Sequence, residues 1–187
     1  MRAALPVLMV LVMSVGFLGQ ASVPHPQPRI PTSEATPGAN DGAALGCDDL
    51  ADYAQNLNRA FADSGEFRQV LSSASFDFQA LTSAEGKVIV RDGKTFVTTI
   101  EKLEVPPVYS DGNKGIVMFM TFLTQEVSFY SIDSSTVPDL NSYDKAMQLI
   151  YNGETNAAAK CPKQVKSMGG YIFLNPKDIE DQFNTGN

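Results

Sequence analysis

The chain has 187 residues, with 14 Lys and Arg against 21 Asp and Glu, a formal net charge of −7, one His and two Cys. Zinc sites built from Cys and His clusters, His-based catalytic triads and His-ligated haem need more of these residues than the chain has. The acidic balance argues against nucleic-acid binding, because neutralising phosphates requires a basic surface.

The first 21 residues have the layout of a secretory signal peptide. Arg2 gives a short basic start, an apolar run covers residues 3–18, and Gly19-Gln20-Ala21 supplies small residues before the cleavage point. The run is shorter than the roughly 20 residues that span a bilayer, which argues against an uncleaved anchor. We expect cleavage after Ala21, a secreted product and no stable membrane span once the leader is removed.

Residues 22–45 are expected to be a disordered linker, because they hold five of the chain's 11 prolines among small polar residues. Closely spaced prolines exclude helix, and such a stretch buries too little apolar surface to fold. The one histidine, His25, lies here and is not a candidate catalytic base. Residues 46–187 are expected to form one globular domain, with residues 162–187 a C-terminal tail that packs on it.

The first element of the domain is a helix that begins at Asp48 or Asp49, which are good N-terminal capping residues. Apolar residues recur at helical spacing, and Phe67 and Leu71 can extend the same face past Gly65. The inward face carries Leu50, Tyr53, Ala54, Leu57 and Phe61.

Residues 82–103 have two interpretations. Thr82-Ser83-Ala84-Glu85 fits a capping box, apolar residues then follow one helical face, and Pro106-Pro107 stop the helix. The alternative is a β-hairpin that turns at Asp92-Gly93, a strong hairpin signal among β-branched residues. We favour the helix, because residues 96–103 do not alternate between apolar and polar.

The third element covers residues 111–132, where an unbroken apolar stripe at helical spacing is wide enough to be largely buried. The continuous apolar run 116–120 also suits a strand. If the second and third elements were strands, the fold would instead be α+β, with helices on a small antiparallel sheet.

The fourth helix follows Pro138, with Ser142 as its cap, a possible interruption at Gly153, and Pro162 at its end. Lys160 lies in its last turn, where a cation suits the helix dipole.

The tail begins with a turn at Gly169-Gly170 and continues with the apolar block 171–174. We expect this block to pack on the domain, with a partner-binding strand as the alternative. Asn175-Pro176 then predicts the start of a short helix.

The two cysteines support a bundle. An exported chain meets an oxidising compartment, where an even pair of cysteines predicts a disulfide rather than free thiols or a bond between chains. Cys47 begins the first helix and Cys161 ends the fourth, and an up-down-up-down bundle brings these positions to the same end. We therefore predict a mainly α fold, a four-helix up-down bundle closed by a Cys47–Cys161 disulfide.

Catalytic chemistry has little support in the domain. Nucleophilic catalysis usually needs a His base, and no His lies in residues 46–187. The sequence also lacks a Gly-x-Ser-x-Gly elbow, phosphate-binding glycine loops and Glu-x-x-His metal motifs. Carboxylates are the one catalytic class left open, although we favour a solvated acidic surface. The candidate acids are Asp77, Glu101, Glu104, Glu126 and Asp133.

Two other polar clusters predict structure rather than a site. Residues 110–113 offer oxygen ligands but lack the spaced acids and closing Glu of a calcium loop, so a helix cap is the better interpretation. Lys160, Lys163 and Lys166 could contact an anionic surface, but capping and solubility explain them better. We expect no metal and no cofactor.

A small apolar ligand is conceivable, because methionines adapt to irregular ligands and bundles can hold ligands between helices. A Met and aromatic stripe at helical spacing is more often plain core. The candidate pocket residues are Met118, Phe119, Phe122 and Met147.

The resulting hypothesis is an exported, non-enzymatic interaction or binding protein whose partner the sequence does not identify. The first alternative is a carrier of a small apolar ligand in the bundle core. The second is a carboxylate-dependent hydrolase of an extracellular polymer.

Overall fold

The computed structural model describes residues 46–72, 76–135 and 137–184, with side chains through Asp181. The predicted signal peptide (1–21) and linker (22–45) lie outside these residues. Four long helices form the body of the described part: α2 (Leu50–Ala62), α4 (Ser83–Ile100), α5 (Ser110–Ser131) and α6 (Leu140–Lys160). The short elements are α3 (Phe67–Ser72), α7 (Pro162–Ser167), α8 (Pro176–Asn184) and two 3₁₀ turns, η1 (Phe78–Ala80) and η2 (Pro107–Tyr109).

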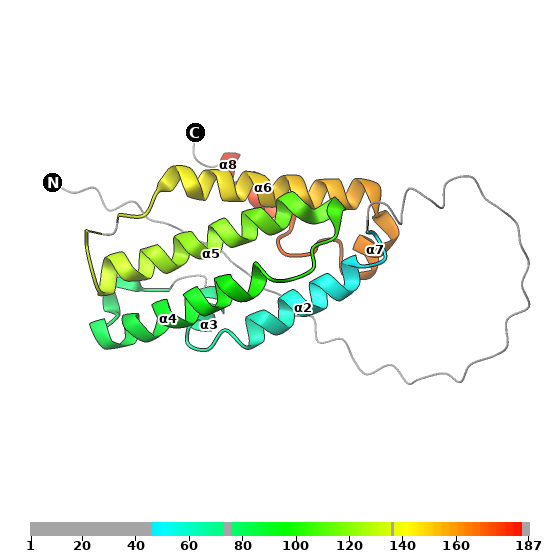
Figure 1. Cartoon of the computed structure of the whole chain (residues 1–187). Coiled ribbons are helices and arrows are strands. Elements are labelled where there is room, and N and C mark those ends of the chain that lie inside the picture. The colour runs from blue at the N-terminus through cyan, green and yellow to red at the C-terminus, as the bar shows by residue number, and fades with distance from the viewer. Residues whose placement is uncertain (1–45, 73–75, 136, 185–187) are drawn as a thin grey trace, which may run out of the picture.

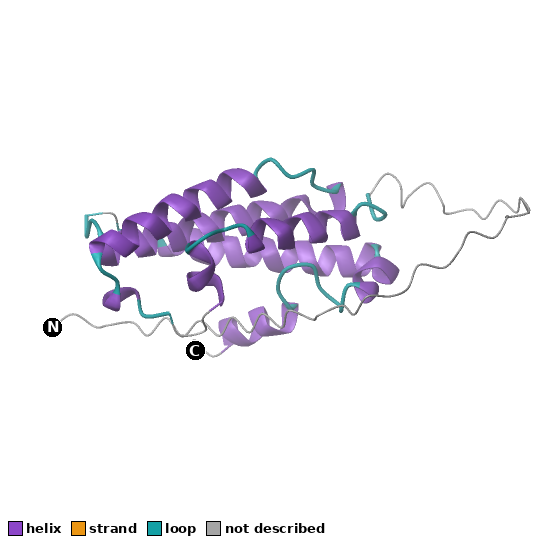
Figure 2. Ribbon diagram, turned by 90° about the horizontal axis from the view of Figure 1, so that it is seen from below, coloured by secondary structure: helices purple, strands orange, loops and turns teal. Residues whose placement is uncertain are grey.

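The four long helices run alternately up and down along a shared axis, as Figure 1 shows. α2 and α5 begin at the end that holds the disulfide, and α4 and α6 begin at the opposite end. α5 packs against both α4 and α6. Figure 2 shows helices joined by loops, and none of the described residues forms a strand. The predicted up-down bundle is therefore confirmed, and the α+β alternative is wrong.

α4 shows why the hairpin interpretation of residues 82–103 fails. The Thr82 hydroxyl accepts a hydrogen bond from the Glu85 backbone N–H at 3.3 Å, and the Glu85 carboxylate accepts one from the Thr82 backbone N–H at 2.9 Å. This is the predicted capping box. Asp92-Gly93 lies inside the helix, where a Cβ atom on the glycine would stand 2.9 Å from the Phe67 ring. The glycine therefore serves close packing rather than a turn.

The apolar face of α2 continues into α3, where Phe67 and Leu71 are buried, but the helix itself does not continue. Gly65 adopts a positive φ of 57° between the two helices. The Asp92 carboxylate accepts a hydrogen bond from the Glu66 backbone N–H at 3.0 Å and would stand 2.5 Å from a Cβ at position 65. Glycine meets both the backbone and the space requirements of this break.

α6 differs from the sequence prediction at two positions, the cap predicted at Ser142 and the interruption predicted at Gly153. Asp139, rather than Ser142, caps the helix, because its carboxylate accepts a hydrogen bond from the Asn141 backbone N–H at 3.0 Å. Gly153 does not interrupt the helix. It lies against Gly112 of α5, where a Cβ atom on Gly153 would stand 2.6 Å from the Gly112 backbone nitrogen. The expected helix breaker is thus the point where two helix backbones meet.

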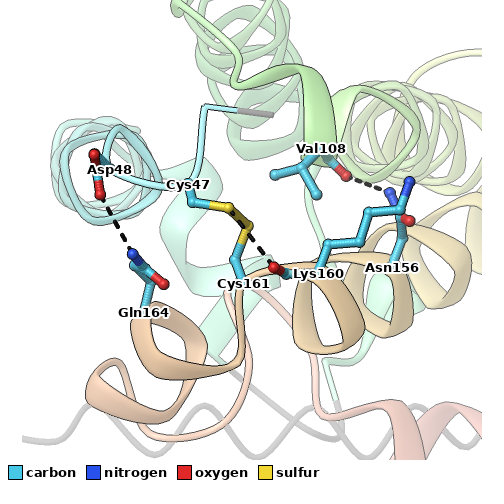
Figure 3. The surroundings of a disulfide bond; sticks show 7 residues. All are labelled: Cys47, Asp48, Val108, Asn156, Lys160, Cys161 and Gln164. Atoms are coloured by element: carbon cyan, nitrogen blue, oxygen red, sulfur yellow. Dashed lines mark hydrogen bonds between the residues drawn. A yellow bond between two sulfur atoms is a disulfide. The ribbon is translucent and has the colours of Figure 1, made fainter. Parts of the chain in front are cut away.

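Cys47 and Cys161 form the predicted disulfide, with their Cα atoms 5.5 Å apart. Cys47 precedes α2, and Cys161 lies between α6 and Pro162, the first residue of α7. Figure 3 shows the bond beside a second link between the same segments, in which the Gln164 amide donates to the Asp48 carboxylate at 3.3 Å. The disulfide prediction is confirmed together with the helix order from which it was made.

The C-terminal segment returns to the bundle after α7. Gly169 and Gly170 both have positive φ, 98° and 102°, and form the predicted turn. Ile172 and Phe173 are buried, and α8 then begins after Asn175. This segment covers apolar surface that the long helices alone would leave exposed.

We predict that Gly153→Ala destabilises the protein. Alanine gains about 0.5–1 kcal/mol in a helix interior over glycine, but its methyl group meets the backbone of α5, which cannot rotate aside. Overpacking of this kind costs about 1–3 kcal/mol, so we expect a net loss of about 1 kcal/mol. Urea unfolding measures it.

The matched control for this prediction is Asn152→Ala, at an exposed neighbour on the same helix. Its free energy of unfolding should stay within about 0.5 kcal/mol of the wild type. A Gly153→Ala protein as stable as the control would contradict the close approach of α5 and α6.

Candidate functional site

The four candidate pocket residues lie in and beside the packed interior between α5 and α6. Phe119, Phe122 and Met147 are buried, and Met118 is partly buried against the same core. The Tyr143 ring packs on two of them, with centroids 6.0 Å from Phe119 and 5.3 Å from Phe122. These contacts are those of core side chains, and the carrier function stays a prediction that they do not favour.

A surface groove of about 340 Å³ lies elsewhere, between α2 and α4. None of the four candidate pocket residues lines it. Four of its polar side chains already have partners in the chain: Thr95 and Thr99 donate to carbonyls one turn earlier, Ser64 donates to the Phe61 carbonyl, and Asp92 accepts from the Glu66 backbone N–H. No described buried side-chain nitrogen or oxygen lacks a hydrogen-bond partner. The groove therefore offers a ligand no buried group that lacks a partner.

The five candidate acids are divided between the two ends of the bundle. Glu101 and Glu104 follow the end of α4, whereas the other three lie near or beyond the opposite end of the bundle. Asp77 caps η1, accepting from the backbone N–H groups of Gln79 and Ala80. Asp133 accepts from the Ser135 backbone and hydroxyl at 2.9 and 2.6 Å. Glu126 is the one of the five that is buried.

The most deeply buried carboxylate that the structure describes is Glu154 of α6, which is 1% exposed and which no sequence motif singles out. It accepts hydrogen bonds from the Tyr109 hydroxyl at 2.7 Å and from the backbone N–H groups of Ile172 at 2.8 Å, Phe173 at 2.7 Å and Leu174 at 3.2 Å. These donors come from η2 and from the C-terminal segment. Glu154 thus ties the returning chain to the bundle.

Opposing effects set the pKa of Glu154. Burial raises it above the ordinary value, while the bonds from Ile172, Tyr109, Phe173 and Leu174 favour the ionised form and limit the rise. Burial, and then the charge of Glu154, raise the pKa of Tyr109, so its hydroxyl stays protonated and donates. The cluster has the geometry of a structural anchor: every group that meets the carboxylate is a donor.

A second tyrosine extends this buried polar cluster. The Tyr53 hydroxyl donates to the Asn113 side chain at 2.9 Å, and the Tyr53 and Tyr109 rings lie 5.4 Å apart. Asn113 belongs to the stretch 110–113, which offers oxygen ligands in the sequence, and the structure places this stretch in the first turn of α5. Its side-chain oxygen is occupied by the tyrosine.

The opposite end of the bundle has a different character. The described large apolar side chains that are exposed all lie where α5 ends and α6 begins, at the left of Figure 1. We call this surface the apolar end. It comprises Tyr130, Ile132, Val137 and Leu140, which are 43%, 37%, 74% and 55% exposed.

Neighbouring elements hold the apolar end in place. The Phe78 ring of η1 stacks on Tyr130 with centroids 6.0 Å apart. α4 approaches at Gly86, where a Cβ atom would stand 2.6 Å from the Ser131 Cβ and 3.4 Å from the Ile132 side chain. These contacts fix the end of α5, which carries Tyr130 and leads into Ile132, whereas Val137 lies in the connection to α6 and Leu140 begins that helix.

We predict that Glu154→Gln loosens the C-terminal segment. Glutamine removes the cost of burying a charge but turns an amide NH₂ toward backbone donors, and we expect a net loss of about 2 kcal/mol. Hydrogen exchange should show the largest loss of protection at the amides of Ile172 and Phe173. The control is Glu104→Gln, at an exposed position after the end of α4, which should change neither the stability nor this protection. Uniform loss of protection would contradict the anchoring role.

Glu126 gives a prediction on pH. Burial raises its pKa above the ordinary 4.5, so the folded state binds more protons than the unfolded state between these two values. Its contribution to stability therefore falls as the pH rises through that window. Glu126→Gln should flatten this fall and raise stability at neutral pH relative to the wild type.

Urea unfolding from about pH 4 to about pH 7 measures this difference. Glu101→Gln, at an exposed position, is the control and should leave the slope unchanged. A Glu126→Gln protein with the wild-type slope would contradict the prediction.

Within the described residues, no group of three or more His, Cys, Asp or Glu side chains converges as metal ligands do, and no helix is long and apolar enough to cross a bilayer. Comparisons with protein-family models, with curated proteins and with solved structures found no match to the chain. We therefore take the apolar end, the described feature that packing does not explain, as the candidate functional site.

Proposed function

We propose that the chain is an exported, non-enzymatic interaction protein that docks a partner through its apolar end. The observation that carries the proposal is the gathering of Tyr130, Ile132, Val137 and Leu140 at one end of the bundle. Single exposed apolar residues are ordinary on protein surfaces, whereas several gathered at one end of a domain are typical of an interaction site.

The other features of the chain fit this role. The Cys47–Cys161 disulfide suits an oxidising compartment outside the cytoplasm, and the leader layout of residues 1–21 supports export. The disulfide and the Glu154 anchor strengthen the end of the bundle that lies away from the apolar end, so docking need not disturb them.

The test is site-directed photo-crosslinking in cells that export the protein. A photoreactive residue at Val137 should give one discrete adduct in the exported fraction, because this position is the most exposed of the four. The same residue at Ala51, which is exposed near the start of α2, should give none. Leu140→Asp places an acid in the first turn of α6, where it suits the helix dipole, and should abolish the adduct.

Each component of the proposal can fail separately. Equal adducts from both positions, or none from Val137, would reject docking at the apolar end. An exported chain that begins with Met1 rather than Ser22 would reject the cleaved leader. The far-ultraviolet circular dichroism of Leu140→Asp should match that of the wild type, which separates lost docking from lost folding.

A further inference from the structure

The apolar end has an acidic border. Residues 130–144 include three acids and no Lys or Arg. η1 and the start of α4 bring two more acids to the same end, since Phe78 stacks on Tyr130 and Gly86 lies against Ile132. The five acids are Asp77, Glu85, Asp133, Asp139 and Asp144, and all are exposed. The nearest basic residues in the sequence are Lys87 and Lys145.

Local structure leaves much of this negative charge in place. Asp77, Glu85 and Asp139 accept hydrogen bonds from backbone N–H groups of their own turns. The N-termini of α4 and α6 each supply roughly half a positive charge, and the C-terminus of α5 supplies roughly half a negative one. These partial charges are too small to cancel the excess of five acids over two lysines.

This charge discriminates among possible occupants. A second copy that docked symmetrically through the same end would bring two acidic borders together, which opposes association. An anionic lipid surface would be repelled in the same way. A cationic segment with an apolar face meets both features of the surface at once, because its apolar side chains cover the exposed group while its cations meet the acids.

We propose that the apolar end binds a cationic amphipathic segment of a partner protein, with apolar side chains at helical spacing flanked by Lys or Arg. The inference rests on the proposed docking function and adds the chemistry of the partner to it. It predicts that affinity depends on apolar contact and on charge, and that salt weakens the charge-dependent part.

The test uses three synthetic 14-residue peptides with the same leucine positions and with Lys, Glu or Gln at all other positions. Fluorescence anisotropy measures their binding to the purified chain. The Lys peptide should bind at least about tenfold more tightly than the Glu peptide, and raising the ionic strength from about 0.05 to about 0.5 M should weaken it several-fold.

Three surface variants locate the binding. Val137→Ser and Leu140→Ser remove apolar contact without adding charge, and each should lower the affinity for the Lys peptide about tenfold. Asp144→Asn should weaken it about twofold to fivefold and reduce its salt dependence. The control is Asp52→Asn, at an exposed acid near the start of α2, which should leave binding as it is.

The outcomes separate this inference from the proposed function. If all three peptides bind equally and Leu140→Ser abolishes their binding, the inference of a cationic partner is overturned, while docking at the apolar end is supported. If the Lys peptide binds and neither serine variant weakens its binding, the apolar end is not the binding site, because general attraction to an acidic protein would explain the result. Absence of binding by all three peptides would overturn the inference, whereas the proposed function is tested by crosslinking at Val137.

Discussion

The contact between the backbones of α5 and α6 sets the positions of most other features. Gly112 of α5 lies against Gly153 of α6, where a Cβ atom on Gly153 would stand 2.6 Å from the Gly112 backbone nitrogen. A Cβ atom on Gly115 would stand 2.7 Å from the Ala146 carbonyl oxygen. Helices whose backbones touch cannot slide past one another without side-chain clashes. This register places Glu154, one residue beyond Gly153, beneath η2 and the C-terminal segment.

The two ends of the bundle differ in which interactions hold them and in which side chains they leave exposed. At one end, the disulfide closes the chain between Cys47 and Cys161, and Glu154 accepts four hydrogen bonds. At the other end, caps such as Asp139 satisfy the backbone, while large side chains such as Leu140 remain exposed. The disulfide and the buried polar anchor therefore lie away from the proposed docking surface.

Two buried carboxylates have different roles in this arrangement. Glu154 collects donors from segments that would otherwise be loosely connected, and the free energy of those bonds offsets much of the cost of burying a charge. For Glu126, burial alone accounts for the raised pKa. A carboxylate surrounded by donors suits an anchor, whereas one that burial alone perturbs makes stability depend on pH.

Local signals in the sequence favoured the four long helices and their order, and the structure removed the β-hairpin alternative. The Thr82–Glu85 capping box, the apolar spacing and the cysteine pair predict the helices, the up-down bundle and the disulfide, because each depends on residues a few positions apart or on chain order. Only the tertiary structure decided that Gly153 packs rather than interrupts and that Glu154 is an anchor, since its partner Tyr109 lies 45 residues away. It also decided which apolar residues stay exposed, because amphipathic spacing shows what a helix can bury, but the neighbouring elements determine what is covered.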